Sequence, residues 1–268
     1  MIESLFKKHF AWYKSHCHKL VNGDCAGFNC RCQKWAEIWA IIEEFVPEQY
    51  RTLNIDDFTG LVDNNRQLQL NIVLQAKNII KQYCWANIQE GEDWDKSWIS
   101  KSILNNRKEN CNNLIIHGSS WAKTGDNSKL IHRKLGRTML ASIVMKEAIF
   151  QRIFPNSASD SYGWISYNIL LDKLMSRAND KIEFIDDLSK LEECDWLVID
   201  EIKTGKDHNR VFRASVFDRF LNKRLELRKP TIMVFNEDIE KSSNFTEEFG
   251  NVAEKIVQSN STFKVHLI

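Results

Sequence analysis

The sequence predicts an α/β fold with a mostly parallel sheet in residues 112–268, preceded by a small helical, cysteine-rich module. Short apolar runs alternate with amphipathic stretches from residue 114 onward, as in parallel strands joined by helices. One apolar run, Trp196 to Ile199, leads directly into two acids, Asp200 and Glu201. Only three prolines and ten glycines occur in 268 residues, which favours a helix-rich chain.

The composition is that of a folded chain with almost no net charge. Hydrophobic residues make up 43% of the sequence, and 37 Lys and Arg face 36 Asp and Glu. The net charge of +1 therefore favours no class of partner, and only local clusters can do so. No apolar stretch has the length of a membrane-spanning helix, and the N-terminus lacks an apolar core of the secretory type. We therefore expect a cytoplasmic protein with reduced cysteines.

The first half of the chain has helical periodicity on both sides of a connector. Apolar residues recur at helical spacing in three stretches: residues 5–13, 35–45 and 66–84. The connector and the polar stretch after the third helix lack such a period. The predicted division is a helical module in residues 1–47, a linker and helix in 48–111, and the α/β domain in 112–268.

The second half alternates between strands and helices. The expected strands cover residues 114–118, 163–167, 195–200, 231–236 and 263–267. The expected helices cover residues 138–154, a stretch ending at residue 175, and residues 211–228. Such alternation predicts helices on both faces of the sheet.

The acidic end of one strand is the first candidate functional feature. In open α/β sheets, ligands bind beyond the carboxyl ends of the strands, where Asp200 and Glu201 would lie. An aspartate there can hold Mg²⁺, and a glutamate beside it can orient water for attack on a phosphate. Two solvated acids at a strand end are the alternative interpretation.

A phosphate-binding loop is expected after the strand that ends at Gly118, but the pattern departs from G-x-x-x-x-G-K-[ST]. In the favoured interpretation Gly136, Arg137 and Thr138 begin the following helix, with Arg in place of Lys. Thr138 could then hold Mg²⁺ together with Asp200, and the amides at the helix N-terminus could bind phosphate. The two glycines are then 18 positions apart where the pattern needs five. The alternative uses Lys123 and Thr124, but it is one residue short and lacks the second glycine.

Four cysteines lie close together between the first two predicted helices. Cys17, Cys25, Cys30 and Cys32 fall within 16 residues, which suits a tetrahedral structural zinc site. Either His16 or His18 can replace one thiol. The spacing matches no standard zinc finger, so unligated thiols are the alternative.

Basic residues crowd the long segment after Gly118: Lys129, His132, Arg133, Lys134 and Arg137. Such a segment suits the phosphates of single-stranded DNA, and Trp121 within it could stack on a base. A solvated loop is the alternative.

The order of these motifs resembles the DnaC/IstB-type AAA+ ATPases, a family of replicative-helicase loaders and their transposition relatives. The resemblance covers most of residues 48–268. It is carried by residues 51–58 as the family's linker, 113–118 as the strand into a divergent Walker A loop, 136–141 as the helix start, and 195–201 as the Walker B strand. It implies an AAA+ P-loop core that binds ATP and Mg²⁺.

The resemblance also implies roles for residues farther along the chain. Arg224 occupies the place of the family's arginine finger, which acts on the ATP of a neighbouring subunit, and Arg228 is the second candidate. Asn236 stands where the sensor 1 residue is usual. Lys255 lies one position from the sensor arginine of the last helix. An arginine finger implies self-association. Some helicase loaders of this family have a zinc-bearing N-terminal module that contacts the helicase, and the cysteine-rich segment of this chain resembles it.

Three hypotheses follow from the sequence. The first is an AAA+ helicase loader that binds a replicative helicase and single-stranded DNA under ATP control. The second is a non-catalytic AAA+-like adaptor with a degenerate nucleotide site. The sequence does not decide whether ATP is hydrolysed or only bound. The third is a transposition regulator of the IstB type. The divergent motifs would also fit a phage product.

Overall fold

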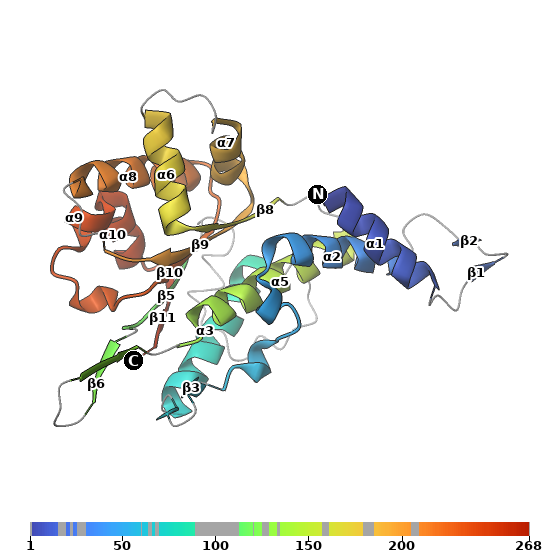
Figure 1. Cartoon of the computed structure of the whole chain (residues 1–268), viewed down its shortest axis with the longest axis horizontal. Coiled ribbons are helices and arrows are strands. Elements are labelled where there is room, and N and C mark those ends of the chain that lie inside the picture. Colours follow the sequence, from blue (N-terminus) through green and yellow to red (C-terminus); the bar gives the residue numbers. More distant parts are fainter. Residues whose placement is uncertain are drawn as a thin grey trace.

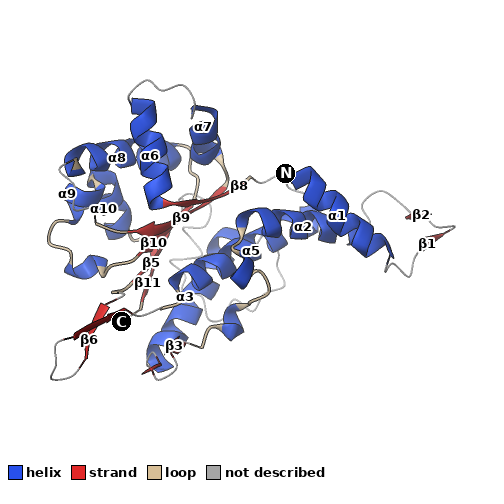
Figure 2. Ribbon diagram, viewed as in Figure 1, coloured by secondary structure: helices blue, strands red, loops and turns tan. Residues whose placement is uncertain are grey.

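The protein is described by a computed structural model, shown in Figures 1 and 2. The structure describes residues 2–15, 20–21, 24–25, 31–59, 61–63, 66–67, 70–88, 113–119, 121–124, 129–132, 135–156, 161–178, 185–204 and 209–267. None of the helices in these ranges is long and apolar enough to cross a membrane.

A five-stranded parallel sheet forms the centre of the molecule. Its spatial order is β11 (Phe263–His266), β5 (Leu114–His117), β10 (Thr231–Phe235), β9 (Trp196–Ile202) and β8 (Tyr162–Ser166). All four neighbouring pairs are parallel. The parallel α/β class predicted from the sequence is thus confirmed, and each expected strand forms. Strand β9 continues two residues beyond Asp200, where the sequence predicted its end.

Helices cover both faces of this sheet (Figure 1). On one face lie α3 (Leu70–Ile88) and α5 (Arg137–Asn156), and on the other lie α6 (Tyr167–Ala178), α8 (Arg210–Glu226) and α10 (Asn251–Gln258). The sequence did not predict α7 (Ile185–Glu193) or the short α9 (Phe245–Phe249).

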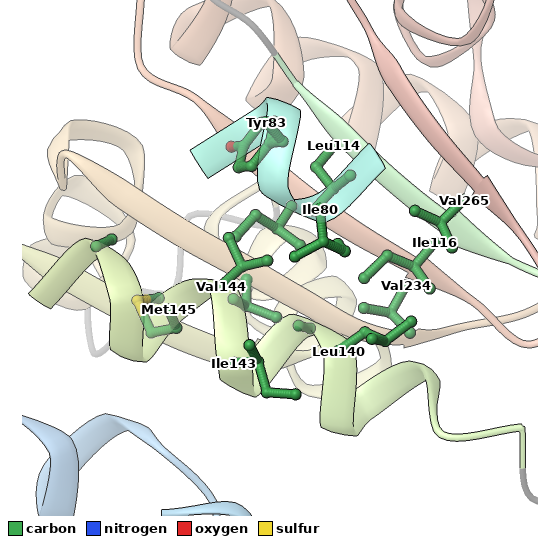
Figure 3. Close-up of a cluster of buried hydrophobic side chains, with 14 of the residues drawn as sticks. Ile80, Tyr83, Leu114, Ile116, Leu140, Ile143, Val144, Met145, Val234 and Val265 are labelled. Atoms are coloured by element: carbon green, nitrogen blue, oxygen red, sulfur yellow. The ribbon is translucent and has the colours of Figure 1, made fainter. Parts of the chain in front are cut away.

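Alternating strand residues divide between two hydrophobic cores. Ile116 and Val234 join the core beneath α3 and α5, whereas Ile115 and Met233 join the core beneath α6 and α8. Figure 3 shows the first core, where Ile80 and Tyr83 of α3 and Val144 of α5 meet the strands. Strands buried on both faces are apolar at successive positions, which is the pattern the sequence has.

The N-terminal helices pack onto the same body. Helix α1 (Ile2–Ser15) packs along α2 (Arg31–Phe45) and has no buried residue. Lys8 and His9 of α1 both contact the carboxylate of Glu43 in α2, at 2.9 and 2.7 Å. Ile38 and Ile42 of α2 belong to the core under the sheet. The division at residues 47 and 111 stays a prediction, and the buried core runs across its first boundary.

The connector after α2 folds into two 3₁₀ turns, η1 (Glu48–Tyr50) and η2 (Ile55–Asp57). Arg51 donates hydrogen bonds to the carbonyls of Val46 and Glu43, at 3.0 and 2.7 Å, which satisfies acceptors at the end of α2. Small two-stranded hairpins pair β1 (Leu20–Val21) with β2 (Asp24–Cys25), β3 (Leu61–Asp63) with β4 (Arg66–Gln67), and β6 (Trp121–Thr124) with β7 (Lys129–His132).

The amino edge of the sheet is closed by a buried guanidinium, that of Arg224 in α8. This residue is 1% exposed. It donates hydrogen bonds to Thr231 Oγ1 and to the carbonyls of Pro230, Leu191 and Cys194, at 2.9, 2.8, 2.7 and 3.0 Å. A guanidinium that is held inside the fold in this way cannot reach the nucleotide of a neighbouring subunit. The prediction that Arg224 is an arginine finger is therefore wrong.

Replacing Arg224 by methionine is expected to lower the free energy of unfolding by at least about 3 kcal/mol, because the variant leaves several buried acceptors without a donor. Urea unfolding followed by circular dichroism measures the change. The control is Arg219→Met on the exposed side of the same helix, which should change stability by less than about 0.5 kcal/mol. Equal effects of the two substitutions would contradict this structural role of Arg224.

Candidate functional site

The carboxyl ends of three adjacent strands meet at one edge of the sheet. Strand β5 ends next to Gly118, β10 ends before Asn236, and β9 carries Asp200 and Glu201 near its end. The first turn of α5, with Arg137 and Thr138, returns to this edge and contacts all three strand ends. The structure therefore brings together the residues that the sequence predicted for both halves of a nucleotide site.

Arg137 joins two of these strand ends. Its guanidinium donates hydrogen bonds to the carbonyl oxygen of Gly118 and to Oδ1 of Asn236, the latter at 3.1 Å. The residue is 7% exposed, so this positive charge lies inside the site and not on the surface. A guanidinium and the N-terminus of a 20-residue helix at one point form an environment that favours an anion.

Thr138 and Asp200 face each other across the site. The Thr138 hydroxyl donates to Asp200 Oδ1 at 3.4 Å, and Ser142 Oγ donates to the Thr138 carbonyl at 2.8 Å. A hydroxyl and a carboxylate are oxygen ligands of the kind Mg²⁺ takes, usually together with waters and substrate phosphates. The donor set that the sequence assigned to Mg²⁺ thus fits a hard divalent cation.

The carboxyl group of Asp200 is mostly buried, and burial raises its pKa above the ordinary value. Hydrogen bonds from the Glu201 amide and the Thr138 hydroxyl act in the opposite direction. The Glu201 amide lies 2.8 Å from Asp200 Oδ1. A carboxylate that is costly to keep charged gains from a bound cation, so this environment is suited to a metal ligand.

Glu201 sits on a bulge in β9. Met233 pairs with Ile199 and Phe235 with Ile202, so β9 has one residue more than β10 over this stretch. Glu201 has a φ of 59°, which a non-glycine residue rarely adopts, and its side chain is exposed. The bulge turns this carboxylate out of the sheet at the site edge. Backbone strain of this kind is characteristic of functional positions.

The segment between β5 and α5 contains a two-stranded hairpin, where the sequence predicted a phosphate loop much longer than the usual pattern. Strands β6 and β7 pair in antiparallel register from Trp121 with His132 to Thr124 with Lys129, and the hairpin projects from the body in Figure 1. Lys123 and Thr124 lie in β6 and do not begin a helix, so the alternative phosphate loop at these residues is not supported. The helix begins at Arg137, as in the favoured interpretation.

Two glycines permit close packing around this segment. A side chain at Gly118 would place its Cβ 1.9 Å from the carbonyl oxygen of Leu267. Gly136 has a φ of 72°, and its Cβ would lie 2.8 Å from the ring of Phe58. Phe58 belongs to the linker and is buried against the start of α5. The linker therefore packs directly on the backbone that precedes Arg137.

The remaining predicted site residues have different outcomes. Arg228, the second candidate for the arginine finger, follows α8, is exposed and has a φ of 55°. Lys255 is exposed on α10, and no contact between the described residues brings it to the site. Cys17 and Cys30 lie outside the described residues, as do His16 and His18. Of the other two cysteines, Cys25 is described only as part of β2, and Cys32 lies half-buried in α2 and forms no disulfide with a described residue.

Glu237 is a site residue that the sequence analysis missed. Its carboxylate accepts hydrogen bonds from the amide and hydroxyl of Thr204, at 2.8 and 2.6 Å, and its carbonyl accepts from the Gly118 amide at 3.2 Å. It thus connects the segments that follow β5, β9 and β10. Its position directly after Asn236 was the available signal.

Comparison with solved structures gives the fold a wider context. The crystal structure of the DnaC helicase loader aligns with 82% of this chain and 99% of its own, with a TM-score of 0.51 and 15% identity. The DnaI structure aligns with 84% of this chain and 92% of its own, with a TM-score of 0.43 and 14% identity. No protein-family model matches the sequence, and no curated protein matches it.

Five parallel strands with helices on both faces, and a candidate site at their carboxyl edge, form a parallel α/β fold of the kind that P-loop AAA+ proteins have. Within that class the chain has a DnaC-type fold, because nearly the whole DnaC structure aligns with it. The hairpin between β5 and α5 replaces the compact phosphate loop. At 15% identity this likeness establishes the fold, and any function must be argued from the site.

Replacing Asp200 by asparagine is expected to stabilise the fold at about pH 7, by roughly 0.5–2 kcal/mol. The amide keeps an acceptor oxygen for the Glu201 amide and removes a buried charge. Because burial raises the pKa of Asp200, the folded state favours its protonated form. The stabilisation from that proton is present below 3.8, the ordinary pKa, and is lost as pH rises through the folded pKa.

The advantage of Asp200→Asn should therefore be small near pH 3.8 and complete at neutral pH. Urea unfolding at both pH values tests this, with Asp172→Asn on the exposed side of α6 as the control. A loss of stability at neutral pH in Asp200→Asn would contradict the expectation.

Proposed function

We propose that this protein is an AAA+-type helicase loader that acts in DNA replication and responds to ATP. The observation that carries the proposal is the meeting of Arg137, Thr138, Asp200 and Asn236 at the carboxyl edge of three adjacent parallel strands. A cation-binding pair and an anion-binding helix start at one edge suit a Mg²⁺–nucleotide complex. The DnaC-type fold supports the replication role.

Each residue has a defined part in this proposal. Thr138 and Asp200 would hold Mg²⁺, whose charge offsets that of the phosphates. Arg137 and the amides of the first turn of α5 would bind phosphate, while Asn236 positions the Arg137 guanidinium. The exposed Glu201 carboxylate would orient a water molecule and accept its proton.

Further partners follow from the same proposal. Because Arg224 is committed to the core, Arg228 is the arginine that we assign to a neighbouring subunit's nucleotide, which requires self-association. The N-terminal module would bind the replicative helicase, with zinc at Cys17, Cys25, Cys30 and Cys32. Helix α1 supports this assignment because none of its residues is buried and Trp12 is 58% exposed. The basic β6–β7 segment would contact single-stranded DNA in the cytoplasm.

A second candidate, the non-catalytic adaptor, is favoured by one specific observation. The usual compact phosphate loop is replaced by the β6–β7 hairpin, and the Arg137 guanidinium is hydrogen-bonded to Gly118 and Asn236. In this candidate the site binds nucleotide as a ligand without turnover, or binds none. Binding and hydrolysis therefore need separate measurements.

We expect Mg²⁺-dependent ATP hydrolysis that single-stranded DNA stimulates, and a loss of at least about 100-fold in Glu201→Gln with nucleotide affinity retained. The reason is that glutamine can hold a water molecule but cannot accept its proton. Phosphate release and the fluorescence of a labelled ATP measure the two properties separately.

The matched control is Glu193→Gln, an exposed glutamate beside the opposite, amino end of β9, which should behave as wild type. Nucleotide binding without hydrolysis in the wild type would select the adaptor. Absence of both would overturn the nucleotide site itself.

The partner can be tested by capture of purified proteins. A replicative helicase should be retained by the full chain, and Trp12→Ala should weaken this binding by at least about tenfold, because exposed tryptophans are frequent anchors of interfaces. The control is Ile169→Ala, which removes a side chain 53% exposed on α6 at another part of the surface. Capture of a transposase in place of the helicase would favour the IstB-type alternative.

A further inference from the structure

Two histidines are stacked at the carboxyl edge of the sheet, beside the candidate nucleotide site. His117 ends β5 and His266 ends β11, and their ring centroids are 4.2 Å apart with an interplanar angle of 17°. Two carboxylates from the turn after β10, Asp238 and Glu240, lie against the rings. None of these four residues was singled out by the sequence, and the proposed function does not use them.

His117 has polar atoms that the fold leaves unsatisfied. The residue is 0% exposed, and neither of its ring nitrogens has a hydrogen-bond partner among the described residues. Burying such groups without a partner is costly, so a ligand that binds them is favoured.

The distances fit a divalent metal ion. One ligand atom each from His117, His266 and Glu240 lies within 4.8 Å of the others. His266 Nδ1 and Glu240 Oε2 are 3.5 Å apart. Nitrogen and oxygen ligands lie about 2.0–2.2 Å from zinc, so neighbouring ligand atoms of a tetrahedral site are about 3.3–3.6 Å apart. The two rings would have to rotate out of their stacked arrangement for both lone pairs to point at one ion.

Asp238 lies where a supporting carboxylate belongs. Its Oδ1 is 3.2 Å from His266 Nε2 and 3.6 Å from His117 Nδ1. It is fixed by the Glu240 amide, which donates to Oδ1 at 3.2 Å, and by Lys241, whose ammonium lies 3.1 Å from Oδ2. Histidines that bind metals commonly donate their other ring N–H to a carboxylate, which sets the tautomer.

We infer that His117, His266 and Glu240 form a binding site for Zn²⁺ or a similar divalent transition metal, with Asp238 orienting the two imidazoles. The ion joins the edge strand β11 to β5 and to the turn after β10. This site is separate from the predicted cysteine site, and its ligand set contains no thiolate. Glu240 is exposed, so water completes the coordination.

The test is the zinc affinity and zinc content of the full-length chain and of two variants. Calorimetric titration of metal-free protein with Zn²⁺ and elemental analysis after dialysis give the two quantities. We expect Glu240→Gln and His266→Gln each to bind one equivalent of Zn²⁺ fewer than wild type, or to bind it at least tenfold more weakly. Asp238→Asn is expected to bind it about 10–100-fold more weakly, as a supporting residue does. Zn²⁺ should raise the Tm of wild type more than that of the ligand variants.

The comparison between variants removes any contribution of the cysteines, since these are present in every protein tested. His9→Gln and Glu247→Gln are the controls, because both residues lie on other elements, and both variants should bind Zn²⁺ as wild type does. Glu240 is exposed, so its variant is expected to fold even if a histidine variant does not. Equal zinc affinity, content and Tm response in wild type and Glu240→Gln would overturn the inference.

Discussion

The parallel pairing of β5, β10 and β9 is the constraint from which the rest of the molecule follows. Parallel strands place all their carboxyl ends at one edge of the sheet. Residues that are far apart in sequence therefore meet there because of the strand direction alone. Arg137 and Asn236 are 99 positions apart, yet their side chains are hydrogen-bonded. The same pairing gathers all the amino ends at the opposite edge, where polar groups must also be satisfied.

At both edges of the sheet, an arginine side chain donates hydrogen bonds to these polar groups. At the amino edge the Arg224 guanidinium is nearly inaccessible and satisfies acceptors before β9 and β10. The Asn113 side chain adds an acceptor for the Thr231 amide, at 3.0 Å. At the carboxyl edge Arg137 joins two strand ends, but beside a helix N-terminus and two acids. The amino edge is thereby buried as part of the core. The carboxyl edge keeps charged groups and a strained backbone, which can bind a ligand.

The sequence predicted the strands, the main helices and the acidic edge because those features depend on local periodicity and on strand order. It did not predict that the Arg224 side chain is buried. A buried and an exposed arginine have the same sequence context and differ only in the carbonyls that surround them. It did not reveal the bulge at Glu201, because a strand register is a property of two strands. The sequence did show that the segment between Gly118 and Gly136 is unusually long. It did not predict the hairpin in this segment, because polar residues specify strand pairing only weakly.

The stacked histidines extend the same reasoning to the edge strand. His117 immediately precedes Gly118, whose carbonyl accepts from Arg137 and whose amide donates to Glu237. A ligand that holds His117 therefore also restrains the peptide on which the Arg137 guanidinium rests. Leu267 packs against Gly118 too closely for a side chain, so β11 cannot shift without moving that peptide. The proposed metal site and the candidate nucleotide site thus share the backbone at the end of β5. An ion bound by His117, His266 and Glu240 would therefore affect the geometry of the nucleotide site through this backbone segment.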